Sequence, residues 1–217
     1  MALVSSNRMM PSSNGTYIIF DTPAQHVDWP VRSSYVLLLE SWMENQGFSL
    51  KARDNFSSPA SLSFNSPKKI ISHNIVSQLK SSKQCVLILT KNTKKLTGII
   101  PFELTYAIDE CKLPLVIMYP DYESITSPQK LSMYWPKELK SRIENRQVKA
   151  IHIPFLRLPA RDALRRFHLN GKQCLPNGYG HFNTKAYQDW GLQSSLTNNT
   201  SISQAIRSQP LIVKFAR

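Results

Sequence analysis

Residues 85–119 read CVLILTKNTKKLTGIIPFELTYAIDECKLPLVIMY. Two unbroken apolar runs, Cys85–Leu89 and Leu115–Tyr119, enclose a basic loop and a helical stretch that begins at Pro101. Continuous apolar runs of this kind are typical of strands that a parallel sheet buries on both faces. A strand, a helix and a second strand in this order predict one parallel β-α-β unit.

The same alternation of strand-like and helical stretches continues on both sides of this unit. Its members are a strand over 17–20, a helix that Ser33 or Ser34 caps and Gly47 ends, a strand over 48–52, a helix from Pro67, a strand over 150–155 and a helix over 161–169. This order predicts an α/β protein, a flavodoxin-like three-layer sandwich with a parallel five-stranded sheet. Ligands of such folds bind at the carboxyl ends of the strands.

The length of 217 residues suits one domain with some additions. The pattern predicts an N-terminal extension over 1–16, a central domain over 17–170 and a C-terminal extension over 171–217. The long segment from about 121 to 147 contains Pro128 and Pro136 and is predicted to be an insertion in that domain.

The composition excludes several classes of protein. Hydrophobic residues make up 41% of the chain, which is enough for a core, and the sequence contains neither a GxGxxG nor a Walker-type phosphate loop. The three cysteines lack the spacing of a disulfide framework or a zinc module, so we expect no metal. The first ten residues lack the apolar stretch of a signal peptide, and no run is long enough to span a bilayer. We therefore expect a cytoplasmic protein without a membrane partner.

The net charge of +13 is concentrated in two parts of the chain. Residues 61–100 carry seven lysines and no acidic residue, and residues 137–172 are also strongly basic. A positive field attracts polyanions and phosphorylated small molecules alike. The charge alone does not choose between these two kinds of partner.

Three pieces of the sequence, in this order and spacing, resemble the TIR-like proteins of bacterial Thoeris anti-phage defence. They are an opening strand that ends in Phe-Asp (17–21), a helix and strand followed by an aspartate (38–42, Phe48 and Asp54), and a strand, a variable loop and a helix (75–90 and 101–108). The likeness covers roughly residues 17–120 and implies that the predicted sandwich is TIR-like, with a TIR-like domain over 17–170.

The resemblance implies an activity and a set of partners. TIR enzymes cleave the bond between nicotinamide and ribose in NAD+, which is a substrate and not a cofactor. Thoeris members respond to a phage-derived trigger and release a diffusible ADP-ribose-type signal that activates a separate effector. A homo-oligomer is one candidate assembly, which the sequence leaves open. The resemblance places the catalytic glutamate at Glu103.

Glu103 suits this chemistry because the leaving nicotinamide is already cationic and needs no strong general acid. The transition state has oxocarbenium character at the ribose, and a fixed carboxylate stabilises that charge. A second interpretation stays open: near the start of a helix, glutamate is also favoured simply as a capping residue.

Five further residues are candidates for binding substrate. Phe20 and Asp21 end the first predicted strand, where Phe20 lines a nicotinamide or adenine pocket or is a core aromatic, and Asp21 binds a ribose or forms a turn. Asp54, after the second strand, invites the same two interpretations. Phe102 adjoins Glu103, and Ile99 stands where the family commonly has a tryptophan, so His26 and Trp29 are candidates for the missing aromatic contact.

Other functions remain as alternatives. One is a nucleoside deoxyribosyltransferase-like enzyme, which also uses a carboxylate where a strand leads into a helix. Another is a non-catalytic TIR scaffold that only assembles with partners, which the isoleucine at position 99 favours. Nucleic-acid binding rests on charge alone, because no aromatic residues interleave with the lysines and arginines.

Overall fold

The computed structural model of this chain describes part of its 217 residues. The described ranges are 15–20, 34–44, 46–52, 67–90, 93, 100–171, 173 and 175–192, and within the helix that begins at Pro67 the side chains are described from His73 onwards.

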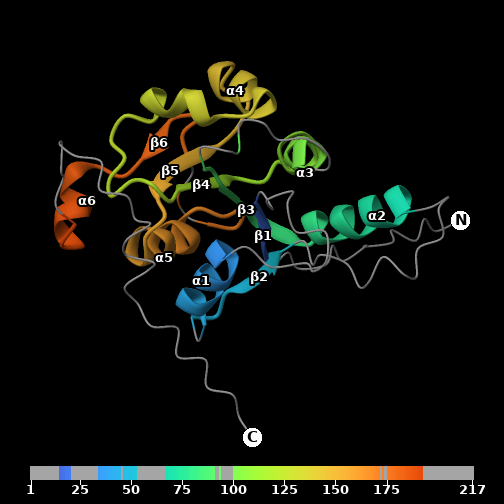
Figure 1. Cartoon of the computed structure of the whole chain (residues 1–217), viewed down its shortest axis with the longest axis horizontal. Helices are drawn as coiled ribbons and strands as arrows, with labels where there is room; N and C mark the ends of the chain where they lie inside the picture. Colours follow the sequence, from blue (N-terminus) through green and yellow to red (C-terminus); the bar gives the residue numbers. More distant parts are fainter. Residues whose placement is uncertain are drawn as a thin grey trace, which may run out of the picture.

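A parallel sheet forms the middle layer of the fold (Figure 1). Its strands are β1 (Gly15–Ile19), β2 (Ser49–Ala52), β3 (Ser82–Ile88), β4 (Leu115–Tyr119), β5 (Ala150–Pro154) and β6 (Gly180–His181). The spatial order is β2-β1-β3-β4-β5-β6, and each neighbouring pair is parallel. Strands β1 to β5 thus follow the flavodoxin-like order.

Side chains alternate between the two faces of this sheet, as the period of a strand requires. On β1, Tyr17 and Ile19 join one core cluster, whereas Ile18 and Phe20 join the other. β3 and β4 divide their side chains in the same way, so the central strands are apolar on both faces. This explains the unbroken apolar runs in the sequence.

Helices cover both faces of the sheet (Figure 1). One face packs against α1 (Ser34–Met43), α5 (Arg157–Arg166) and α6 (Thr184–Asp189). The other face packs against α2 (Pro67–Lys80), α3 (Ile100–Thr105), the π-helical turn η3 (Tyr106–Glu110), the 3₁₀ segment η4 (Pro128–Tyr134) and α4 (Lys137–Glu144). The predicted α/β class is therefore confirmed.

The strand count differs from the prediction of five. β6 is a two-residue strand that pairs with β5 through Ile151–Gly180 and His152–His181. Two residues in a stretch rich in glycine, proline and asparagine leave no hydrophobic period to detect, because only the neighbouring strand defines the pairing.

The segment 121–147, predicted to be an insertion, contains η4 and α4. α4 buries Leu139 and Ile143 against the sheet and supplies the helix of the connection from β4 to β5. Its eight residues and the preceding prolines hide the helical period in the sequence. The predicted domain boundaries remain a prediction.

Candidate functional site

Glu103 lies in the first turn of α3, the helix that follows β3. Its neighbours Ile100 and Leu104 are buried in the core and hold α3 against the sheet. Glu103 itself is only 1% exposed. Burial of a carboxylate is costly unless hydrogen bonds replace its water, so the contacts of this side chain decide what it can do.

The phenol of Tyr17 supplies one such contact. Its hydroxyl donates a hydrogen bond to Oε1 of Glu103 over 2.7 Å, and the bond is buried. Tyr17 stands in the middle of β1 and is fully buried. The carboxylate on α3 is therefore tied directly to the sheet.

Cys85 lies beside this pair. It is the partner of Tyr17 in the register between β1 and β3, and its side chain belongs to the same face of the sheet. Burial, and secondarily the negative charge of Glu103, raise the pKa of the Cys85 thiol well above its ordinary value. The thiol is therefore neutral at physiological pH and is a packing group, not a nucleophile.

Phe102 lies on the exposed side of α3. It is 38% exposed, and its ring packs against Tyr106 with the centroids 5.8 Å apart. This pair places an aromatic surface next to Glu103 in the chain. The sequence analysis named Phe102 as a candidate for binding substrate, but its packing against Tyr106 is seen only in the structure.

Phe20 lies away from Glu103. It is 3% exposed and belongs to the core cluster that α1 covers, on the face of the sheet opposite Tyr17 and Glu103. Its position in this structure is that of a core aromatic. Substrate binding by Phe20 remains an untested prediction.

Several predicted site residues lie outside the described residues. They are Asp21, Asp54 and Ile99, together with His26 and Trp29.

A threonine turn follows β3 at the carboxyl edge of the sheet. The backbone N–H of Thr90 donates to Oγ1 of Thr93 over 2.7 Å, and the N–H of Thr93 donates to the carbonyl of Thr90 over 3.1 Å. Sequence reasoning missed this turn and also missed Tyr17. A phenol in an otherwise aliphatic strand was the available signal, because a buried tyrosine hydroxyl usually has a hydrogen-bond partner.

A second buried polar cluster surrounds His152 on β5. His152 contacts the hydroxyl of Tyr119 and the carbonyl of Gly178, and Trp135 donates to the same hydroxyl. Burial lowers the pKa of His152 to about 4. Both ring nitrogens are occupied, so this cluster is a structural network of the core. Among the residues that the structure describes, no group of three His, Cys, Asp or Glu side chains is placed to hold a metal.

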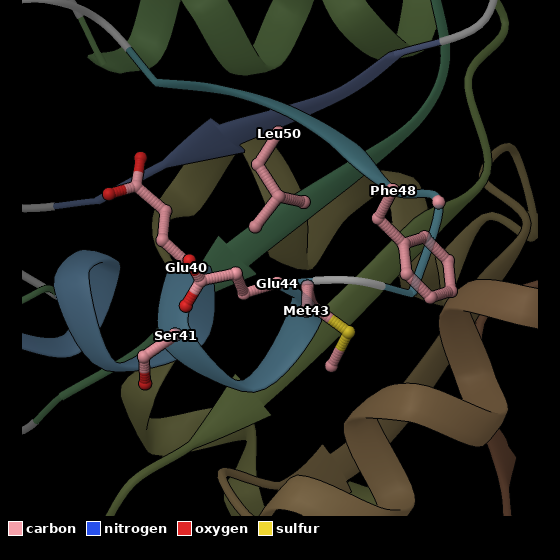
Figure 2. Close-up of a pocket in the computed structure, with 7 residues that line it drawn as sticks. Glu40, Ser41, Met43, Glu44, Phe48 and Leu50 are labelled. Carbon is pink, nitrogen blue, oxygen red and sulfur yellow. The ribbon is translucent and has the colours of Figure 1, made fainter.

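A surface hollow of about 660 Å³ lies at a different place (Figure 2). It is lined by Glu40, Ser41, Met43, Glu44, Gly47, Phe48 and Leu50. These residues come from the end of α1 and the start of β2, and thus from the amino end of that strand. Ligands of flavodoxin-like sheets bind at the opposite, carboxyl edge, so we do not assign the site to this hollow.

The parallel sheet in flavodoxin-like order, with a buried glutamate in the first turn of the helix after β3, defines a flavodoxin-like α/β domain. Residues 30–125 match the family model described as Thoeris protein ThsB, TIR-like domain. This segment is therefore similar to the Thoeris TIR-like domain, in agreement with the resemblance seen in the sequence. The match includes Glu103, Phe102 and the positions of Asp54 and Ile99, and it begins after Tyr17.

Other comparisons add little. No curated protein matches the chain. A crystal structure of a conserved protein from Enterococcus faecalis matches with 16% sequence identity over 55% of this chain and 72% of that chain, with a TM-score of 0.35. At that score the likeness carries no argument about fold or function. None of the described helices is both long and apolar enough to cross a membrane.

Proposed function

We propose that this chain is a TIR-type NAD+ nucleosidase or cyclase of Thoeris defence, in which Glu103 stabilises the oxocarbenium-like transition state at the ribose. The observation that carries this proposal is the buried carboxylate of Glu103, tied to β1 by Tyr17 in the first turn of α3. A carboxylate fixed in a water-poor site stabilises positive charge far more than one in bulk water does. The family match supports the same assignment.

The reaction breaks the bond between the ribose C1′ and the nicotinamide nitrogen. The bonding electrons leave with nicotinamide, which becomes neutral, and positive charge develops on the ribose. Water, a hydroxyl of the same molecule or another acceptor then bonds to C1′ and loses a proton. These three routes give hydrolysis, cyclisation or conjugation, and the product serves as the diffusible ADP-ribose-type signal to an effector.

The burial of Glu103 bears on how the activity is controlled. Because the side chain is 1% exposed, NAD+ reaches the carboxylate only after the groups that cover it move. An enzyme that stays silent until a phage-derived trigger acts has this property. Activity in the cytoplasm and assembly into a homo-oligomer belong to the same proposal.

The burial also favours a second candidate function. A glutamate that stays covered can hold α3 against β1 without any reaction, and the chain is then a non-catalytic TIR scaffold. The two candidates differ in turnover and in their response to substitution of Glu103.

The test is incubation of the purified chain with NAD+, with and without lysate from phage-infected cells, followed by chromatography and mass spectrometry of nicotinamide and ADP-ribose species. We expect nicotinamide release by the wild type and a loss of about a hundredfold or more in Glu103→Gln, because the amide carries no charge. Glu110→Gln is the matched control, since it makes the same change at an exposed position of η3.

Each outcome decides between the candidates. A folded Glu103→Gln protein that releases nicotinamide like the wild type removes this mechanism. The product mass separates hydrolysis or cyclisation from conjugation. No turnover of NAD+ in either condition favours the scaffold, unless deoxynucleosides react instead, which selects the deoxyribosyltransferase-like alternative.

A further inference from the structure

Tyr17 occupies one of the most constrained positions in the described part of the chain. Its strand β1 lies between β2 and β3, and its backbone is in register with Lys51 on one side and with Cys85 on the other. The ring is fully buried in the core cluster of that face. The hydroxyl therefore has a fixed position relative to the sheet.

The carboxylate that this hydroxyl contacts lies on a short helix. α3 spans only Ile100–Thr105 before the backbone changes to the π-helical turn η3. A long, flexible glutamate side chain has several rotamers, and a donor within 2.7 Å of Oε1 selects those that keep the bond. The direction of the carboxylate thus depends on β1 as well as on α3.

The chemical nature of the donor matters as much as its place. A lysine or arginine partner would neutralise the carboxylate, whereas a phenol satisfies one of its oxygens and leaves the negative charge in place. Cys85, next to Tyr17, also stays neutral because burial raises its pKa. Neither of these two neighbours therefore offsets the negative charge that the proposed reaction uses.

We propose that Tyr17 is a positioning residue, whose hydroxyl sets the direction of the Glu103 carboxylate and favours its ionised form. This inference rests on the proposed function for its catalytic meaning, and the hydrogen bond itself is testable without turnover. Tyr17 lies outside the segment that matches the family model, so the match does not assign it a role.

The experiment compares the wild type with Tyr17→Phe, which removes only the hydroxyl. The protein is labelled with ¹³C in the glutamate side chains, and the signal of Glu103 is assigned by its absence in Glu103→Gln. Because a hydrogen bond to the charged form favours ionisation, we expect the titration midpoint of Glu103 to move up by about one to two pH units in Tyr17→Phe. We also expect kcat for nicotinamide release to fall about tenfold to a hundredfold with little change in KM.

Tyr187→Phe is the matched control. It removes another buried tyrosine hydroxyl, one that bonds the backbone of Ile125 and lies in the core cluster on the opposite face of the sheet. We expect the midpoint of Glu103 to stay at its wild-type value in this variant. An unchanged midpoint in folded Tyr17→Phe, or an equal shift in both variants, overturns the proposal.

Two further outcomes are kept apart by the design. If the wild type releases no nicotinamide in any condition, the proposed function fails while the titration still decides the role of Tyr17. If Tyr17→Phe does not fold, wild-type protein with 3-fluorotyrosine at position 17 replaces it. The ¹⁹F chemical shift is expected to change with pH at the titration midpoint of Glu103. A chemical shift that does not change at that midpoint overturns the proposal.

Discussion

At the scale of single residues, His152 is a buried titratable group with a partner on each ring nitrogen. Its Nδ1 lies 2.8 Å from the hydroxyl of Tyr119, and its Nε2 lies 2.9 Å from the carbonyl oxygen of Gly178. A carbonyl only accepts, so Nε2 carries the proton and Nδ1 accepts from Tyr119. Trp135 donates to the same hydroxyl over 2.8 Å, which completes the network.

This arrangement predicts a loss of stability in mild acid. Burial, more than the charge of His181, lowers the pKa of His152 from 6.5 to about 4. Between pH 6.5 and pH 4, the imidazole of His152 therefore binds a proton in the unfolded chain and stays neutral in the folded chain. The contribution is fully present above pH 6.5 and is lost as the pH falls toward 4, by about 3 kcal/mol in total.

The measurement is urea unfolding at about pH 7 and about pH 4, for the wild type and for His152→Gln, which does not titrate. The variant is less stable at neutral pH. Between the two conditions, its free energy of unfolding should fall by about 3 kcal/mol less than that of the wild type. Equal changes in both proteins would contradict a neutral, buried His152.

At the scale of elements, one helical stretch differs from its sequence prediction. The sequence predicts one helical stretch from Pro101, and the structure has α3 followed by the π-helical η3. The N–H of Cys111 donates to the carbonyl of Tyr106, five residues earlier, over 3.0 Å. Hydrophobic periodicity does not separate such a turn from an α-helix, and π-helical turns are frequent at functional sites.

An ion pair connects η3 to α4. Arg142 donates from Nε to Asp109 over 2.9 Å and makes a second bond to the same carboxylate from Nη2. The hydrogen bond from Arg142 holds the pKa of Asp109 below its ordinary value. α3 also contacts α4. The ion pair therefore adds a second connection between α4 and the helical stretch that carries Glu103.

Removing the pair should cost little, because the Asp109 side chain is 41% exposed and solvent screens the attraction. We expect Asp109→Asn to lower the free energy of unfolding by about 1 kcal/mol or less. A double-mutant cycle with Arg142→Gln, measured by urea unfolding, isolates the interaction between the two side chains. A coupling energy well above 1 kcal/mol would contradict the expectation that solvent screens this pair.

At the scale of the whole molecule, β6 extends the sheet beyond the five strands of the predicted domain. A Cβ atom at Gly180 would lie 2.4 Å from the carbonyl oxygen of Ala150 on β5, which is backbone and cannot move aside cheaply. The close approach of the two strands therefore requires glycine here.

Gly180→Ala tests whether the edge of the sheet depends on this approach. The added methyl group must separate β6 from β5, so we expect a loss of about 1 to 3 kcal/mol in the free energy of unfolding. His181→Ala, an exposed position on the same strand, is the control and should cost less. Equal stability of Gly180→Ala and the wild type would show that β6 contributes little, and the predicted boundary at residue 170 would then describe the domain well.

The sequence by itself determined the α/β class, the central strands and the position of Glu103 at the start of a helix. Strands such as β4 are buried on both faces, so their composition alone predicts them, and Leu115–Tyr119 was predicted with the bounds that the structure has. Glu103 was found by its place in a family pattern, and its burial was not predicted.

Only the tertiary structure decided what surrounds these residues. Tyr17 and Glu103 stand 86 positions apart in the chain, and His152 and Gly178 stand 26 apart. Such pairs depend on strand register and on how each helix packs on the sheet, and local patterns contain neither quantity. The two-residue strand β6 exists because β5 offers it backbone partners. These features are cooperative, and a sequence read one segment at a time does not determine them.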